Sequence, residues 1–195
     1  MNVMLDYNKY FQKNRLDKFS LKKDHDGNHL FRVLFLSLSL CDKLDVKGAD
    51  REIVAFASMY HDVGRNNDDF DIMHGIRGWK KVKHIFTNDF DEKNKQIVKY
   101  IIENHCIPDQ VAYKNVSYYT ITNERKMTYL LNIEKDADSL DITRFGFFEE
   151  KYLRFAQSKE LIPLANILNE LGDVIKDPSK LQKKLIENGL VNYYM

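Results

Sequence analysis

The chain has 195 residues, of which 44% are hydrophobic and 30% are charged, so it can bury a core and is neither disordered nor collagen-like. Thirty basic residues against 29 acidic ones leave a net charge of +1, so no global field draws the chain to nucleic acid or to an anionic membrane. Three prolines and eight glycines argue against a turn-rich all-β protein.

The number of cysteines and the lengths of the apolar stretches indicate the cellular compartment of the protein. Two cysteines, Cys41 and Cys106, are too few for a disulfide framework, and both are expected to be small buried apolar side chains. The N-terminus carries a charge within six residues, so it has no signal-peptide core. The apolar stretch 30–41 contains an arginine and is shorter than the ~20 residues that span a bilayer. We expect a soluble cytoplasmic protein.

Apolar spacing predicts one helix after another, and hence an all-α fold. Helices are expected over 24–44, from an Asp50 cap to Gly64, and over 72–86, 91–105 and 123–143. The polar residues 66–71 separate the second of these helices from the third, and Pro108 closes the fourth. Residues 111–122 are rich in β-branched and aromatic side chains and predict a short hairpin or an extended loop. The last 45 residues predict two or three amphipathic helices, with Pro163 and Pro178 near helix starts.

The chemistry of the chain is expected at its histidines. A lone histidine is more often packed or solvated than a ligand, so the argument depends on several of the six acting together. His61 and Asp62 follow each other at the end of an apolar helix, and Asp138 lies beside the apolar stripe of another helix, where a carboxylate is costly to bury unless it is paired or bound to metal. Imidazole and carboxylate together suit Mn, Fe, Co, Ni or Zn.

These residues resemble the HD-domain superfamily of metal-dependent phosphohydrolases. The order of His29, the His61-Asp62 doublet and Asp138 matches its motif. The run from Arg65 to Arg77, RNNDDFDIMHGIR, is similar to R-x-N-D-x-x-D-x-x-H-G-x-R in an uncharacterised bacterial branch, which also has paired histidines like His25 and His29. The resemblance covers roughly residues 25–146. It implies one HD-type domain, with a core over about 20–146 and a helical extension over about 147–195.

The resemblance also implies the ligands. His29, His61, Asp62 and Asp138 would hold one divalent transition metal ion. His74 and His105 correspond to the extra ligands of dinuclear members, with Asp62 bridging two ions. The sequence Cys106-Ile107-Pro108 after His105 departs from the branch. One or two ions per chain are therefore expected.

Several charged residues are candidates for substrate contact. Asp62 and Arg65 are the expected catalytic residues, and Arg65 either binds phosphate or pairs with Asp68 or Asp71. Further substrate-binding candidates are Arg77, Arg144 and His25, the last of which is either substrate-facing or merely exposed. Asp68 and Asp71 either orient the ligand histidines or cap loops. Arg32 is expected in a structural ion pair.

Three functions follow from this resemblance. The first is hydrolysis of a phosphomonoester or phosphodiester, with a nucleotide as the favoured example, by metal-activated water. The second is a di-iron oxygenase, and the third is an inactive module that senses a ligand. The expected partner is a small phosphorylated substrate, with neither membrane nor nucleic acid. The C-terminal helices either cover the core or form a homodimer.

Overall fold

The computed structural model describes residues 2–21, 27–85, 89–120 and 123–190, which form helices and no strands. The α-helices are α1 (Val3–Lys13), α2 (Gly27–Lys43), α3 (Gly48–Tyr60), α4 (His74–Val82), α5 (Glu92–Asn104), α6 (Asp109–Asn115), α7 (Glu124–Asp141), α8 (Ala156–Lys159), α9 (Ile162–Glu170) and α10 (Pro178–Glu187). Short 3₁₀ helices span Leu16–Lys18, Val116–Tyr118, Ile142–Phe145, Glu150–Tyr152 and Gly172–Lys176. The all-α prediction is confirmed.

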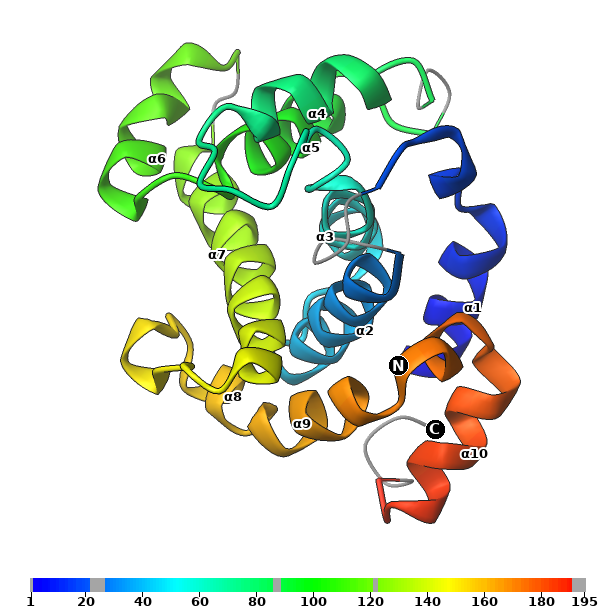
Figure 1. The fold of residues 1–195 in the computed structure, drawn as a ribbon. Coiled ribbons are helices and arrows are strands. Elements are labelled where there is room, and N and C mark those ends of the chain that lie inside the picture. The colour runs from blue at the N-terminus through cyan, green and yellow to red at the C-terminus, as the bar shows by residue number, and fades with distance from the viewer. Residues whose placement is uncertain (1, 22–26, 86–88, 121–122, 191–195) are drawn as a thin grey trace.

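The centre of the fold is formed by α2, α3, α5 and α7 (Figure 1). α2 packs against α3 and α7, and α5 packs against both α3 and α7. The apolar face of α2 is buried almost along its whole length because it meets neighbours on several sides. α4 packs on α5, whereas α1 and α9 pack against α2, and α10 packs against α1 (Figure 1). One apolar core therefore includes side chains from Val3 to Leu185.

Several helix boundaries follow the expected signals. Asp91 accepts the Asn94 amide and Asn123 accepts the Lys126 amide, so both act as N-caps of the helices that follow them. Pro163 and Pro178 lie in the first turns of α9 and α10. Asp50, by contrast, is not a cap: α3 begins at Gly48, and Asp50 in its first turn pairs with Lys126.

Two other predictions need correction. α4 begins at His74, not Ile72, because the Asp71 carboxylate accepts the Met73 amide in a turn, and it ends at Val82. The expected hairpin at 111–122 is wrong for 111–120, where α6 and a 3₁₀ helix follow Pro108; 121 and 122 lie outside the described residues. Ala112 and Val116, four residues apart, are buried together, so packing outweighs β-propensity there.

An ion-pair cluster ties the C-terminal segment to the central helices. Arg154 donates to both oxygens of Asp109 through Nε at 2.8 Å and Nη2 at 2.7 Å, and Lys135 Nζ lies 2.6 Å from the same carboxylate. Burial alone would raise the pKa of Asp109, but its bonds with Arg154 and Lys135 outweigh this and lower it. The ionised carboxylate therefore stabilises the folded chain.

We expect Asp109→Asn to be less stable than the wild type at neutral pH, with a difference that shrinks on acidification. A carboxyl whose folded pKa lies below its unfolded value stabilises above the unfolded pKa of about 3.9 and loses that contribution as the pH falls through the lower folded value. Urea unfolding of both proteins at neutral pH and below about pH 4 measures the difference. A gap of the same size at both pH values would contradict this role of Asp109.

None of the helices in the described ranges is both long and apolar enough to cross a bilayer.

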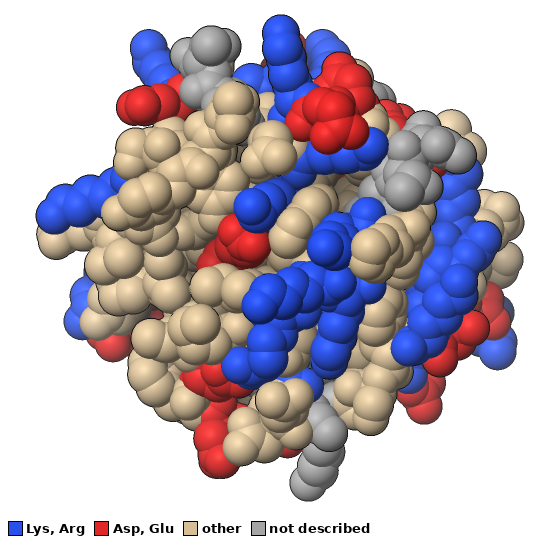
Figure 2. Space-filling model, turned by 90° about the horizontal axis from the view of Figure 1, so that it is seen from above, with Lys and Arg blue, Asp and Glu red and all other residues tan. Residues whose placement is uncertain are grey.

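Positive charge is concentrated on one face of the molecule. Lys and Arg side chains gather over the centre and right of the face that Figure 2 shows, which is seen from the side where α4 lies in Figure 1. α4 has no acidic residue in its first turn and exposes Lys80 and Lys81. A chain of nearly neutral net charge therefore still has a basic face.

Candidate metal centre

Six side chains from five parts of the chain meet between the central helices. One side chain comes from α2, and two adjacent side chains follow the end of α3. The other three come from the start of α4, the end of α5 and the last turns of α7. The six are His29, His61, Asp62, His74, His105 and Asp138. All except Asp138 are buried, and the Asp138 side chain is 33% exposed. The proposed ligands are thus brought together, with one side open.

The first group consists of two histidines and two carboxylates. His29 Nε2 lies 3.1 Å from His61 Nε2. Asp62 Oδ2 lies 3.4 Å and 3.7 Å from these nitrogens, and Asp138 Oδ1 lies 3.5 Å and 3.6 Å from them. Ligand atoms of a tetrahedral ion bound at about 2.05 Å are themselves about 3.3 Å apart. The group therefore has the spacing of a coordination shell.

The second group lies on the other oxygen of Asp62. His74 Nε2 and His105 Nε2 are 2.8 Å apart, and Asp62 Oδ1 lies 2.9 Å from the first and 3.3 Å from the second. Each oxygen of this carboxylate thus faces one pair of histidines. A carboxylate between two ions has this arrangement, so the geometry suits two ions as well as one.

The four imidazoles are held in one orientation by their other ring nitrogens. Nδ1 of His61 meets Ser58 O at 2.8 Å, Nδ1 of His105 meets Ile102 O at 2.8 Å, and Nδ1 of His74 meets Asp71 O. A carbonyl oxygen only accepts, so each Nδ1 must donate its proton. The Nε2 lone pairs are then directed to the centre, as ligation requires.

His29 is oriented by a carboxylate that the sequence analysis did not include among the site residues. Asp141 Oδ2 lies 2.7 Å from His29 Nδ1, and the Asp141 carboxylate also accepts from Arg32 Nε at 2.6 Å and pairs with Arg144. Arg32 is thus in the ion pair that was expected. The missed signal was spacing: Asp141 follows Asp138 by three residues and Arg32 follows His29 by three, so each pair shares a helix face.

The charges of the site favour a cation. Burial alone would lower the pKa of His61, but Asp62, Asp138 and Glu134 outweigh it and raise the pKa to about 10. Burial also lowers the pKa of His74, yet its bond to Asp62 raises it to about 9 overall. Burial and the neighbouring histidines lower the pKa of His105 to about 4, although Asp62 opposes them. Each pair of histidines therefore contains at least one site where positive charge is stabilised.

A second acidic residue near the site was also missed. Glu134 is fully buried, burial raises its pKa, and Oε1 lies 3.7 Å from His61 Nδ1. Neither of its oxygens has a hydrogen-bond partner among the described residues. Glu134 precedes Asp138 by four residues on α7 and so shares its face, a signal that the sequence contained.

The open side of the site leads into a cavity of about 200 Å³. Arg65, Asp68, Asp71, His74, His105, Cys106 and Asp138 are among its lining residues. Arg65 Nε lies 3.0 Å from Asp62 Oδ1, and Nη1 donates to Asp69 O at 3.3 Å. The ion pair of Arg65 is thus with Asp62, a partner that the sequence analysis did not consider beside Asp68 and Asp71. Arg65 therefore contacts the proposed ligand Asp62 and also lines the cavity.

The other substrate candidates have protein partners. Arg77 pairs with Asp71 and donates to Gly64 O at 3.1 Å, and Arg144 pairs with Asp141. The Asp71 main-chain oxygen, rather than its carboxylate, contacts His74. These contacts give both arginines a structural role, and substrate binding by them stays a prediction. His25 lies outside the described residues.

Glycines let α4 lie close to the neighbouring segments and so place His74. A Cβ on Gly75 would lie 2.3 Å from Ile102 O, and a Cβ on Gly64 would lie 1.9 Å from His74 O. Both obstacles are main-chain atoms, which cannot move alone. α4 can approach α5 this closely, and His74 can contact His105, because glycine at positions 64 and 75 has no Cβ.

We expect Gly75→Ala to cost about 1–3 kcal/mol of stability, as overpacking does, and to weaken the second ion more than the first. Gly27→Ala is the matched control, because its Cβ would first meet Lys176 Cε at 3.4 Å, an ordinary contact in a helix that also carries a ligand. Thermal melts and cobalt titrations of both variants measure the two effects. Equal behaviour of the two variants would contradict the close-packing role of Gly75.

Comparison with known proteins gives one match. The HD domain family model matches residues 26–143, more than half of the chain, which includes the five helices that carry the six side chains. No curated protein and no solved structure matches the chain significantly. The chain belongs to the HD domain family.

Proposed function

We propose that this protein is a metal-dependent phosphohydrolase that cleaves a small phosphomonoester or phosphodiester, such as a nucleotide, with one or two divalent transition metal ions. The HD domain is associated broadly with metal-dependent hydrolysis, which supports the class of reaction. His29, His61, Asp62 and Asp138 would hold one ion, and His74, His105 and Asp62 the other. A bound ion lowers the pKa of water and stabilises charge on a phosphoryl oxygen.

One observation carries the proposal: four buried imidazoles direct Nε2 at the two oxygens of one carboxylate. Nitrogen pairs 3.1 Å and 2.8 Å apart repel unless a proton or a metal ion lies between them. The donor set of nitrogen and carboxylate oxygen suits Mn, Fe, Co, Ni or Zn. The residues present therefore fit the proposed cofactor.

Arg65, a basic side chain among the residues that line the cavity, supports an anionic substrate. Arg65 lines the cavity beside Asp62 and Asp138, and its guanidinium is suited to a phosphate oxygen. Lys81 donates to Val63 O at 2.9 Å and Arg77 to Gly64 O, so α4 places basic side chains next to the loop that follows the His61-Asp62 doublet. The basic face in Figure 2 would attract a phosphate to this side of the molecule.

The test is elemental analysis of protein purified without added metal, followed by a screen of phosphate esters with Mn, Co, Ni and Zn. We expect bound transition metal and release of phosphate that chelation abolishes and readdition restores. Arg65→Ala should keep its metal and lose roughly 10- to 1,000-fold in kcat/KM, the range for one charged contact in a transition state.

Other outcomes identify the rival functions. Two irons with a mixed-valence EPR signal and no phosphatase activity would contradict hydrolysis and favour the di-iron oxygenase. Wild-type protein that binds no metal under any loading condition would contradict the metal centre and leave the ligand-sensing module. Homodimerisation, cytoplasmic location and the lack of nucleic-acid or membrane partners stay predictions.

A further inference from the structure

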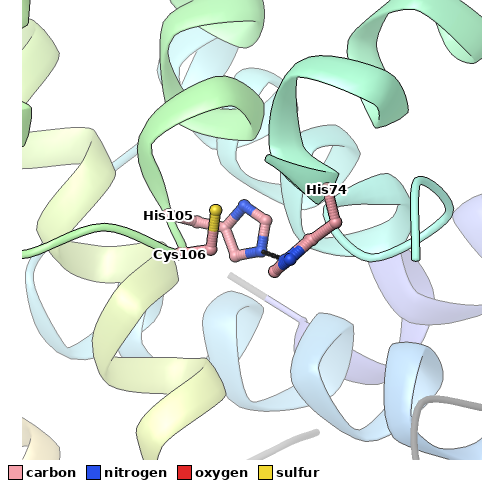
Figure 3. A group of neighbouring side chains, drawn as sticks. All are labelled: His74, His105 and Cys106. Carbon is pink, nitrogen blue, oxygen red and sulfur yellow. Dashed lines mark hydrogen bonds between the residues drawn. The ribbon is translucent and has the colours of Figure 1, made fainter. Parts of the chain in front are cut away.

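Cys106 lies next to the second pair of histidines and has no part in the proposed function so far. Ligand atoms of His74, His105 and Cys106 all lie within 4.8 Å of one another. Figure 3 shows His74 reaching in from the start of α4, while His105 and Cys106 follow each other after the end of α5. The cysteine was expected to be a buried apolar side chain, but it is partly exposed and lines the cavity.

The two histidines point to a ligand independently of the cysteine. They are only 1% and 6% exposed, their Nε2 atoms are 2.8 Å apart, and both Nδ1 atoms face carbonyl oxygens. Two lone pairs thus converge on one place. With metal–nitrogen bonds of about 2.05 Å and a metal–sulfur bond of about 2.3 Å, tetrahedral nitrogen and sulfur ligands lie about 3.5 Å apart. A separation within 4.8 Å needs only a small side-chain movement to reach that value.

We propose that Cys106 Sγ is a ligand of the second metal ion, together with His74 and His105. This inference rests on the proposed function, because it assumes that the second group of ligands binds an ion. The thiol now donates to Ile72 O at 3.4 Å, a weak bond that ligation would replace. On binding, the sulfur–metal bond forms and the thiol proton leaves to solvent through the adjoining cavity.

A thiolate changes which ion the second site prefers. The first group offers only imidazole nitrogen and carboxylate oxygen, whereas the second would add a soft sulfur donor. Soft donors select zinc and similar ions over magnesium and manganese, which prefer oxygen. The two sites would therefore differ in preference, with zinc or cobalt held at the second.

Cys41 provides a matched control within the same chain. It is fully buried in α2, and burial raises its pKa to about 12, so it neither reaches an ion nor reacts readily. Cys106 and Cys41 are the two cysteines of the sequence. Any sulfur–metal signal or rapid thiol reaction is therefore assigned by two single substitutions.

The experiment is a titration of metal-free protein with Co²⁺, followed by absorption spectroscopy. Wild type and Cys41→Ser should bind two equivalents and show a near-ultraviolet sulfur-to-cobalt charge-transfer band. Cys106→Ser should lose the band, keep the visible cobalt bands of the first site, and bind the second ion at least roughly tenfold more weakly. Zinc should slow alkylation of Cys106 by iodoacetamide in wild type but not in His105→Ala.

The outcomes separate the two proposals. A wild type that binds cobalt without the charge-transfer band would overturn the thiolate ligand and leave the metal centre and its hydrolysis intact. A band that persists in Cys106→Ser would also overturn it. Failure of the wild type to bind any cobalt or zinc would overturn this inference and the proposed function together.

Discussion

Asp62→Asn is expected to lose bound metal and phosphatase activity together. Both oxygens of Asp62 face histidine pairs, so one substitution removes a charged ligand from each of the two groups. Substitution of residues that only orient ligands already costs about 10–100-fold in metal affinity or activity, and a shared direct ligand should cost more. Elemental analysis after dialysis, calorimetric titration with Co²⁺ or Zn²⁺ and a phosphate-release assay measure the effects.

Asp45→Asn is the matched control for this change. Asp45 is an exposed carboxylate with a positive φ of 56°, a conformation that asparagine tolerates, and its ion-pair partner is Lys47. Its metal content and activity should equal those of the wild type. Circular dichroism of both metal-free variants separates loss of ligation from loss of folding. A folded Asp62→Asn protein that keeps two ions would contradict a shared carboxylate.

Asp136→Ala should have the largest effect on stability. The fully buried carboxylate accepts from the amides of Arg154 and Phe155, from Arg154 Nη1 at 2.9 Å and from Ser158 Oγ at 2.6 Å. Removing it leaves the amides of Arg154 and Phe155 and the Ser158 hydroxyl without their acceptor, at about 1–3 kcal/mol for each unsatisfied group, while Arg154 keeps Asp109 as its other carboxylate partner. The segment around α8 should separate from α7 before the rest of the chain unfolds.

Urea unfolding and hydrogen exchange of the amides near residue 155 measure this effect. Asp173→Ala is the matched control, since that carboxylate is 84% exposed and its ion pair with Lys176 should contribute within about 1 kcal/mol. A loss at Asp136 no larger than the loss at Asp173 would contradict the anchoring role. Metal content should change less in Asp136→Ala than in Asp62→Asn, because the Asp136 carboxylate is bonded to the 154–158 segment rather than to a proposed ligand.

Local sequence patterns were sufficient to predict the central helices but not α1, α6 or every helix boundary. Caps such as Asp91 and Asn123 act within three residues, so their effect is visible in the sequence. α6 was missed because its helical state depends on Ala112 and Val116 packing into the core, with Tyr100 Oη donating to Ala112 O at 3.0 Å. The N-terminal α1, which packs against α2 and α10, was not singled out either.

The sequence by itself determined the fold class, the family and the identity of six candidate ligands, because helix periodicity and motif order are properties of the chain. Tertiary structure decided which oxygen of Asp62 faces which pair of histidines, that Asp141 orients His29, and that Cys106 lies beside His74. Most of these relations join side chains that lie far apart in the sequence, such as those of His29 and Asp141. They depend on how α4 packs on α5 and α7 on α2, which is set by packing of whole helices and by main-chain carbonyls that no residue type identifies.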